Sequence, residues 1–326
     1  MQKSVNTQQL SIAVSAAIEN AVSSDQDDFR THLGASEIGH KCSRFIWYKF
    51  RWCFKVEFDG AMLRLFNRGH TEEHRFVKWL TKAGFKVEQF DFSHKKLWFS
   101  DIDHRFIVSE NEPMCYQHVS DNDFYHKMAI GAGVDLPQFC FSSVGGHYGG
   151  SCDGKVWAPS EWGFDKPFLL ECKTNKTGSE FNNLKKKGVR SEKRQHYSQF
   201  NVYADKFNLD YILYLNTDKN TDEIYCEVLE VDKNEAQRME QKAEQIIIAR
   251  EPPPRLSDNP AYWECNMCDA KDICFGKQPV EKNCRSCVYA VPADNAEWFC
   301  GHPDVQQNIP KDFIKNGCNA HQTINR

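Results

Sequence analysis

The chain has 326 residues, of which 40% are hydrophobic and 26% are charged, and its formal net charge is −4. This length and composition are those of a soluble globular protein of about two domains. The slightly negative charge excludes a general attraction to nucleic acid, so any contact with phosphate must come from local basic patches.

The compartment follows from the N-terminus and the cysteines. The first 22 residues lack the compact apolar stretch and cleavage site of a secretory signal, and no later run is long enough to cross a bilayer. We therefore expect a cytoplasmic protein without membrane contact. In such a chain the 14 cysteines are expected to be metal ligands or buried thiols rather than disulfides.

Helical patterns come first along the chain. A leading helix is predicted over residues 4–22, followed by an acidic linker. A second helix is predicted from Ser36 through Cys42 towards Phe50, with Ser36 as its N-cap. A third covers residues 69–83.

Strands dominate the next part of the chain. Residues 85–150 alternate apolar and polar side chains, which predicts short strands broken by loops. After them the order is strand, strand, helix, a strand hairpin and a final helix. These segments cover residues 155–159, 168–174, 194–207, 211–217 with 224–231, and 233–250.

The clearest catalytic signal is the pairing of Asp153 with Glu171 and Lys173. In a strand, Glu171 and Lys173 project from one face, and Cys172 projects from the other. Asp153, followed by Gly154 at a tight bend, is expected to approach from the neighbouring strand. Two carboxylates then suit Mg²⁺ or Mn²⁺, and the lysine orients or helps deprotonate water, or stabilises charge on a phosphate.

A purely structural interpretation competes with this one, because charges beside turns and on strands are common on protein surfaces. Here, however, Leu169 and Leu170 directly precede Glu171 in a strongly apolar strand. Charges that interrupt such a strand need a reason to be there, and a site is the simplest one.

A further acid lies upstream on a predicted helix. Glu73 shares a helical face with Val77 and Leu80, which points its carboxylate inward and allows it to complete the shell of the cation. His70 and His74 are one turn apart and are either alternative ligands or surface residues.

Two more features complete the predicted site. Gln199 and Tyr203 are four residues apart on one helix, where they can orient a nucleic-acid strand or support Lys173; the alternative is an ordinary core position for Tyr203. A basic run just before this helix can neutralise a phosphate backbone, although most charge runs are simply solvated. Its members are Lys185, Lys186, Lys187, Arg190, Lys193 and Arg194.

These motifs together carry a family resemblance. In chain order they are Gly69-x-x-x-Glu73, Asp153-Gly154, Glu171-x-Lys173 and Gln199-x-x-x-Tyr203. This order resembles the RecB-like branch of the PD-(D/E)XK nuclease superfamily, which includes phage exonucleases, over about residues 34–275. The resemblance implies an α/β fold with a mixed central sheet flanked by helices. It also implies Asp153 and Glu171 as metal ligands, Lys173 as the catalytic lysine and Glu73 as the first acidic residue, a position where many members have histidine.

The cysteine pattern narrows the resemblance. Cys42 precedes the core, and Cys265, Cys268 and Cys274 follow it with the spacing C-x2-C-x5-C. This is similar to the iron-sulfur arrangement of AddB-type helicase-nucleases and CRISPR-adaptation nucleases, and it implies a 4Fe-4S cluster held by these four residues. Four thiolates suit either iron-sulfur or zinc. The cluster is expected to be structural rather than redox-sensing, because it closes a long loop.

A second set of four thiols follows in the tail. Its members are Cys284, Cys287, Cys300 and Cys318, with His302 and His321 as substitutes. A close pair followed by two distant ligands favours Zn²⁺. The tail is expected to bind DNA, dock a partner or cap the cluster, and Trp298 and Phe299 belong either to a core or to a stacking surface.

The expected organisation has four segments. They are a helix and linker at 1–33, a PD-(D/E)XK core at 34–260, an iron-sulfur segment at 261–283 and a zinc-binding tail at 284–326. The expected function is a metal-dependent DNA exonuclease in phage recombination, repair or degradation. The alternatives are an endonuclease, a nuclease subunit that needs a helicase, recombinase or single-strand-binding protein, and a non-catalytic DNA-binding or scaffold protein.

Overall fold

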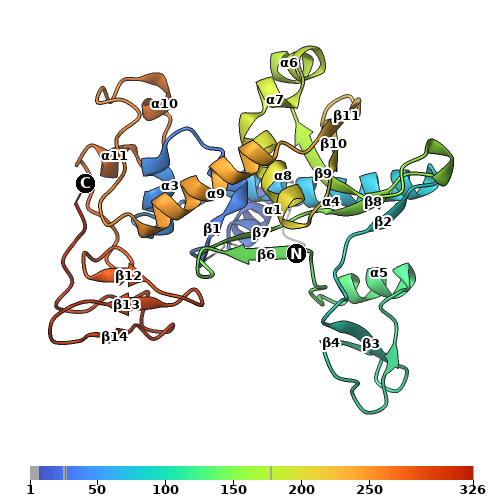
Figure 1. The fold of residues 1–326 in the computed structure, drawn as a ribbon, viewed down its shortest axis with the longest axis horizontal. Coiled ribbons are helices and arrows are strands. Elements are labelled where there is room, and N and C mark those ends of the chain that lie inside the picture. Colours follow the sequence, from blue (N-terminus) through green and yellow to red (C-terminus); the bar gives the residue numbers. More distant parts are fainter. Residues whose placement is uncertain (1–6, 25, 27, 177, 326) are drawn as a thin grey trace, which may run out of the picture.

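The computed structural model describes residues 7–24, 26, 28–176 and 178–325. Residues 4–6 of the predicted leading helix, and Asp25 and Asp27 of the predicted linker, lie outside the described residues. Figure 1 shows a central body of sheet and helices, with a small strand-and-helix insert on one side and the C-terminal tail on the other.

A five-stranded mixed sheet forms the centre of the molecule, with the strand order β11-β10-β9-β8-β2. β9 and β10 pair in parallel, whereas the other neighbours are antiparallel. The strands are β2 (Lys86–Glu88), β8 (Gly154–Trp157), β9 (Phe168–Asn175), β10 (Tyr211–Asp218) and β11 (Ile224–Glu230). The mixed α/β architecture predicted from the sequence is therefore confirmed.

Helices cover both faces of this sheet because its two long central strands are apolar on both faces. Leu170 and Cys172 pack with Phe76 of α4 on one face, while Leu169 packs with Phe200 of α8 on the other. The covering helices are α4 (Gly60–Lys82) and α8 (Arg194–Lys206), and α9 (Lys233–Ile248) packs against α8. Alternate residues of β9 thus face opposite layers.

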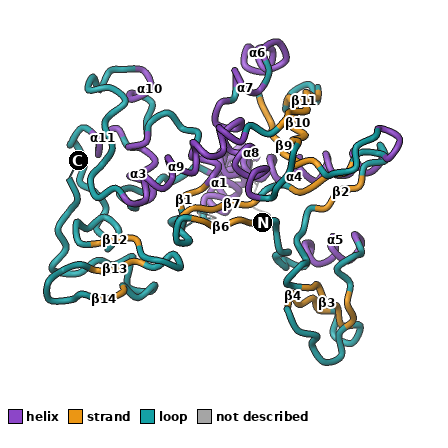
Figure 2. The backbone as a smooth tube through the Cα atoms, viewed as in Figure 1, coloured by secondary structure: helices purple, strands orange, loops and turns teal. Residues whose placement is uncertain are grey.

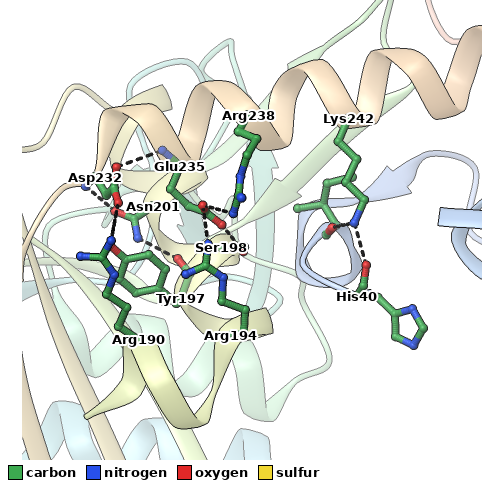
Figure 3. Close-up of polar contacts among 11 residues, drawn as sticks. His40, Arg190, Arg194, Tyr197, Ser198, Asn201, Asp232, Glu235, Arg238 and Lys242 are labelled. Atoms are coloured by element: carbon green, nitrogen blue, oxygen red, sulfur yellow. Dashed lines mark hydrogen bonds and ion pairs between the residues drawn. The ribbon is translucent and has the colours of Figure 1, made fainter. Parts of the chain in front are cut away.

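A buried polar network fixes α8 against α9 (Figure 3). Glu235, only 4% exposed, accepts a hydrogen bond from Ser198 at 2.5 Å and pairs with Arg194 at 2.8 Å and with Arg238. A buried carboxylate with three partners is well satisfied, so it holds the two helices in one relative position. The orientation of α8 matters because this helix carries Gln199 and Tyr203.

The remaining elements surround this core. A small sheet contains β1 (Leu33–Gly34), β7 (Tyr148–Ser151) and β6 (Cys140–Ser143), and the tail sheet contains β12 (Ala290–Pro292), β13 (Trp298–Cys300) and β14 (Gln307–Asn308). The other helices are α1 (Thr7–Ser23), α2 (Ala35–Ile38), α3 (Ser43–Phe50), the 3-10 helix at Ser160–Trp162, α6 (Ser179–Lys187), α7 (Val189–Glu192), α10 (Trp263–Asn266) and α11 (Lys271–Cys274). None of the helices in the described ranges is long and apolar enough to span a bilayer.

The insert has a hydrophobic core of its own. It contains β3 (Lys96–Ser100), β4 (Arg105–Ser109), β5 (Gln117–His118) and α5 (Asp123–Gly131). Leu97 and Phe99 pack there with Val119 and Ala129, apart from the two clusters that flank the central sheet. Figure 2 shows β3, β4 and α5 projecting away from the body. The strand-rich prediction for residues 85–150 is confirmed, but α5 was missed.

The tail belongs to the main core. Arg285 is 1% exposed and lies between the rings of Phe50, Trp52 and Trp298, 4.3 to 4.6 Å from their centroids. Its guanidinium donates to the carbonyl of Thr31 at 3.1 Å. Of the two sequence alternatives for Trp298, the core position is confirmed, because this side chain is buried in the main cluster.

The single helix predicted from Ser36 to Phe50 is wrong, because α2 and α3 are separated by a break at residues 39–42. Ser36 is not an N-cap, since α2 already begins after Gly34. The break has a tertiary cause. A Cβ at Gly39 would lie 2.7 Å from Cα of Gln195 in α8. Lys242 of α9 donates to the carbonyl of Ile38, the last residue of α2, and to that of His40 within the break (Figure 3).

Other boundaries differ less. α4 begins nine residues before the predicted start because Asp59 caps it, accepting the Met62 amide at 2.8 Å. It ends at Lys82, one residue before the predicted end. The predicted elements after Gly150 are all present, whereas α6 and α7 were missed.

Candidate active site

β9 carries the first two site residues. Nζ of Lys173 lies 2.5 Å from Oε1 of Glu171; the Glu171 side chain is fully buried and the Lys173 side chain is 25% exposed. Cys172 faces the opposite, α4 side of the sheet, so the predicted division of these three residues between the two faces is confirmed. The glutamate end of this ion pair is therefore buried, and the lysine end is accessible to solvent.

Asp153 reaches the same place from the segment between β7 and β8. Its Oδ2 accepts the backbone amide of Cys172 at 2.6 Å, just beyond the point where the β8–β9 ladder ends. The following Gly154 has φ of +145°, and a Cβ there would lie 2.5 Å from the carbonyl oxygen of Glu88. Only glycine tolerates this backbone and this close approach of β2, so the glycine holds Asp153 beside β9.

The two carboxylates are short of positive charge. Burial, followed by repulsion from Glu171, raises the pKa of Asp153 to about 8, and burial also raises the pKa of Glu171. Among the described residues, Oε2 of Glu171 has no hydrogen-bond partner, and Oε1 has only the ion pair with Lys173. Buried anions need compensation, so the pair attracts a cation.

The pKa of Lys173 is also raised, but by its neighbours rather than by burial. Burial alone lowers the pKa of this lysine, but the carboxylates of Glu171 and Asp153 outweigh burial and raise it above its ordinary value. The ammonium is therefore fully charged at neutral pH. This arrangement suits a role in charge stabilisation.

Glu73 of α4 lies in the electrostatic neighbourhood of the pair, since its charge contributes to the raised pKa values of Asp153 and Glu171. Its side chain is 32% exposed, and that of His70, 3.7 Å away, is 76% exposed. His74 is exposed as well. Of these three residues, Glu73 is therefore the one whose charge acts on Asp153 and Glu171.

Gln199 and Tyr203 of α8 complete the predicted set. Both are buried, and the Gln199 amide donates to the Tyr203 hydroxyl at 3.4 Å. Burial and the charge of Glu171 raise the pKa of Tyr203, and Lys173 acts on it in the opposite direction. The tyrosine is therefore a neutral hydrogen-bonding group beside the charged residues.

Three polar residues beside the site were missed by the sequence analysis. Tyr214 and Asn216 lie next to Glu171 and Lys173 in the parallel β9–β10 register. The Tyr214 hydroxyl lies 2.9 Å from Nδ1 of His196 and accepts from the Asn216 amide at 3.0 Å. Burial, then Lys173, lowers the pKa of His196 to about 3. The sequence could have indicated Tyr214 and Asn216, because they are two residues apart in an apolar strand and therefore share one face of it.

The predicted basic run is largely neutralised within the protein. Five of its six members have carboxylate partners: Lys185 with Glu223 at 2.7 Å, Lys187 with Glu192 at 3.1 Å, Arg190 with Asp232 at 3.7 Å, Lys193 with Glu180 at 2.9 Å, and Arg194 with Glu235 at 2.8 Å. Lys186 has no carboxylate partner among the described residues. The run therefore offers much less free positive charge than its sequence indicates.

The cysteines of the first set act on one another electrostatically. All are free thiols. Burial raises the pKa of Cys265, and raises that of Cys268 to about 11; the neighbouring thiols of Cys42 and Cys274 add to both shifts. The four residues thus interact although more than two hundred positions separate Cys42 from the others.

The tail cysteines are also neighbours. Burial raises the pKa of Cys284 to about 11, and Cys318, Cys287 and Cys300 contribute to the shift. Nevertheless, in the part of the chain that the structure describes, no group of three or more His, Cys, Asp or Glu residues is arranged to hold a metal ion. The iron-sulfur, zinc and three-carboxylate assignments therefore stay predictions.

No family model matches this chain, and no curated protein matches it. Several solved structures are similar, three of which are described next. SSO0001 is 13% identical, with a TM-score of 0.40 over 82% of this chain and 98% of that one. LHK-Exo in complex with dAMP is 13% identical, with a TM-score of 0.37 over 66% of this chain and 86% of that one. The alkaline exonuclease LHK-Exo from Laribacter hongkongensis is 14% identical, with a TM-score of 0.37 over 71% of this chain and 90% of that one. Since these TM-scores are below 0.5, the functional assignment depends on the geometry of the site.

Proposed function

We propose that this chain is a metal-dependent DNA exonuclease with a RecB-like PD-(D/E)XK core. The observation that carries the proposal is the buried pair Asp153 and Glu171, whose two carboxylates have only one cation, Lys173, beside them at the solvent side. Such a pair suits Mg²⁺ or Mn²⁺, because Mg²⁺ binds through one or two carboxylates and keeps several waters. Asp153 and Glu171 would hold the ion, with Glu73 nearby.

Each residue then has a role that follows from its position. The ion, when bound, lowers the pKa of a water and neutralises charge on the phosphate. Lys173 is charged, so it stabilises the developing negative charge and orients the phosphate rather than acting as a base. Tyr203, held by Gln199, supports Lys173 through a neutral hydroxyl. His196 is neutral and, together with Tyr214, lines the site without adding a positive charge that would compete with the metal ion.

A cleavage assay tests this proposal. End-labelled linear DNA and covalently closed circular DNA are incubated with Mg²⁺, Mn²⁺ or chelator. We expect cation-dependent release of nucleotides from the linear DNA and an intact circle. Asp153→Asn and Glu171→Gln should abolish release, whereas Glu161→Gln, an exposed carboxylate outside the site, should not. Full activity in either site variant contradicts the proposal, and cleavage of the circle favours an endonuclease.

The cysteine sets extend the same proposal. Cys42, Cys265, Cys268 and Cys274 would hold a 4Fe-4S cluster, and Cys284, Cys287, Cys300 and Cys318 would hold Zn²⁺. The support is that the thiols within each set interact electrostatically. Anaerobically purified protein should then be brown and contain iron; colourless protein with zinc alone contradicts the iron-sulfur assignment.

The proposed role is phage DNA recombination, repair or degradation, with DNA as the substrate and with a helicase, recombinase or single-strand-binding protein as the partner class. The same cleavage assay, repeated with and without such a protein, tests that dependence.

A further inference from the structure

Three cations from separate parts of the chain meet at one end of the central sheet. Lys176 directly follows β9, Lys219 directly follows β10, and Arg68 belongs to α4. The backbone amide of Lys219 donates to the Asn175 carbonyl at 2.8 Å, and the guanidinium of Arg68 donates to the Lys219 carbonyl. We refer to Arg68, Lys176 and Lys219 as the strand-end cluster.

Unlike the basic run on α6 to α8, this cluster is not neutralised. None of its three members has a carboxylate ion-pair partner among the described residues. The charge of Arg68 lowers the pKa of Asp222, and that of Lys176 lowers the pKa of Glu180. Both acids are already in ion pairs, Asp222 with Arg75 at 3.0 Å and Glu180 with Lys193 at 2.9 Å. The cluster therefore retains its positive charge.

The cations also repel one another. Burial, followed by the charges of Arg68 and Lys176, lowers the pKa of Lys219. Arg68 and Lys176 are exposed, and Lys219 is half-buried. Three mutually repelling cations that are open to solvent form a favourable place for a polyanion.

The position of the cluster relates it to the candidate active site. Lys176 is five residues beyond Glu171 on the β9 side, and Arg68 is five residues before Glu73 on α4. At about 3.3 Å per residue in a strand and about 1.5 Å in a helix, the separations are about 16 Å and about 8 Å. With about 3.4 Å per nucleotide along one strand of a duplex, this corresponds to roughly two to five nucleotides.

We propose that Arg68, Lys176 and Lys219 bind backbone phosphates of the DNA strand a few nucleotides away from the phosphodiester held at Asp153 and Glu171. This inference rests on the proposed function for its substrate. It assigns the phosphate contacts to residues that the sequence analysis did not single out. It also makes the α6 to α8 basic run mainly a structural feature.

Salt-dependent binding tests this inference. The affinity of the full-length protein for a fluorescent DNA oligonucleotide is measured by anisotropy in chelator, which prevents cleavage, at salt concentrations from 50 to 200 mM. The double variant Lys176→Gln/Lys219→Gln should reduce the slope of log K against log salt by about 1.4 to 1.8, the value for two lost phosphate contacts. The matched variant Lys185→Gln/Lys193→Gln should leave the slope nearly unchanged.

The outcomes separate this inference from the proposed function. If the first double variant keeps the wild-type slope, or if the matched variant loses as much, the strand-end cluster is not the phosphate site. Thermal unfolding of both variants verifies that they fold. If the first double variant loses the expected slope but the wild type never cleaves DNA, the phosphate site is supported and the nuclease assignment is contradicted. If the wild type cleaves DNA but the double variant keeps the full slope, the nuclease assignment is supported and the phosphate site is contradicted.

Discussion

Replacing Asp153 with asparagine should stabilise the metal-free protein while it removes activity. Asparagine keeps an oxygen that can accept the Cys172 amide, now at 2.6 Å from the carboxylate, but it carries no charge. The folded protein raises the pKa of Asp153 from 3.8 to about 8. The folded state therefore binds the proton more tightly than the unfolded state does, and stability falls as pH rises between these two values.

The size of the effect follows from the shift. One unit of pKa is about 1.4 kcal/mol, so ionisable Asp153 costs the folded state at most about 4 kcal/mol at pH 7 and almost nothing below pH 4. In metal-free buffer, we expect the melting temperature of Asp153→Asn to exceed that of the wild type by several degrees at pH 8, and by much less at pH 4.5.

Calorimetry at several pH values, with Glu161→Gln as the control, measures this difference. Added Mg²⁺ should raise the melting temperature of the wild type more at pH 8 than at pH 5, because the ion replaces the proton on Asp153, and it should have little effect on Asp153→Asn. The reasoning is refuted if Asp153→Asn is less stable than the wild type at pH 8, or if the two proteins share one pH dependence.

Three other substitutions give sharp outcomes. Lys173→Met should lower the cleavage rate at least about a hundredfold while DNA binding in chelator is retained, since the lysine stabilises charge in the transition state. Gly154→Ala should lower the free energy of unfolding by roughly 1 to 3 kcal/mol, because its Cβ meets the Glu88 carbonyl, whereas Gly69→Ala, with no atom within 4 Å of its Cβ, should raise it by roughly 0.5 to 1 kcal/mol; chemical denaturation compares the two. Cys268→Ser should abolish the brown colour and bound iron under anaerobic purification; iron content equal to the wild type would contradict the cluster assignment.

Local pattern predicted the strand that carries the site. The alternation of Leu169, Leu170, Glu171 and Cys172 fixed which side chains share a face, because the period of a strand is two, and β9 follows this pattern. The approach of Asp153 followed from a glycine at a bend. Both features depend on neighbours in the sequence, which is why they were accessible.

The features that were missed depend on distant partners. At the break between α2 and α3, Gln195 leaves no room for a side chain at Gly39, and Lys242 donates hydrogen bonds to the carbonyls of Ile38 and His40. Both partners are more than one hundred and fifty residues away in the sequence. The basic run appeared free because its partners, such as Glu223 and Glu235, come from later elements. No local pattern reveals such tertiary pairing, and charge placement was therefore the weakest part of the sequence interpretation.

The burial of Arg285 among Phe50, Trp52 and Trp298 has a consequence for how this protein can be shortened or recombined. Removing the segment after residue 283 would uncover aromatic surface on α3 and leave it facing water, so the shortened chain should aggregate. The C-terminal segment therefore has to be kept together with α3, and a foreign tail in its place would need a side chain that fills the position of Arg285 between these rings.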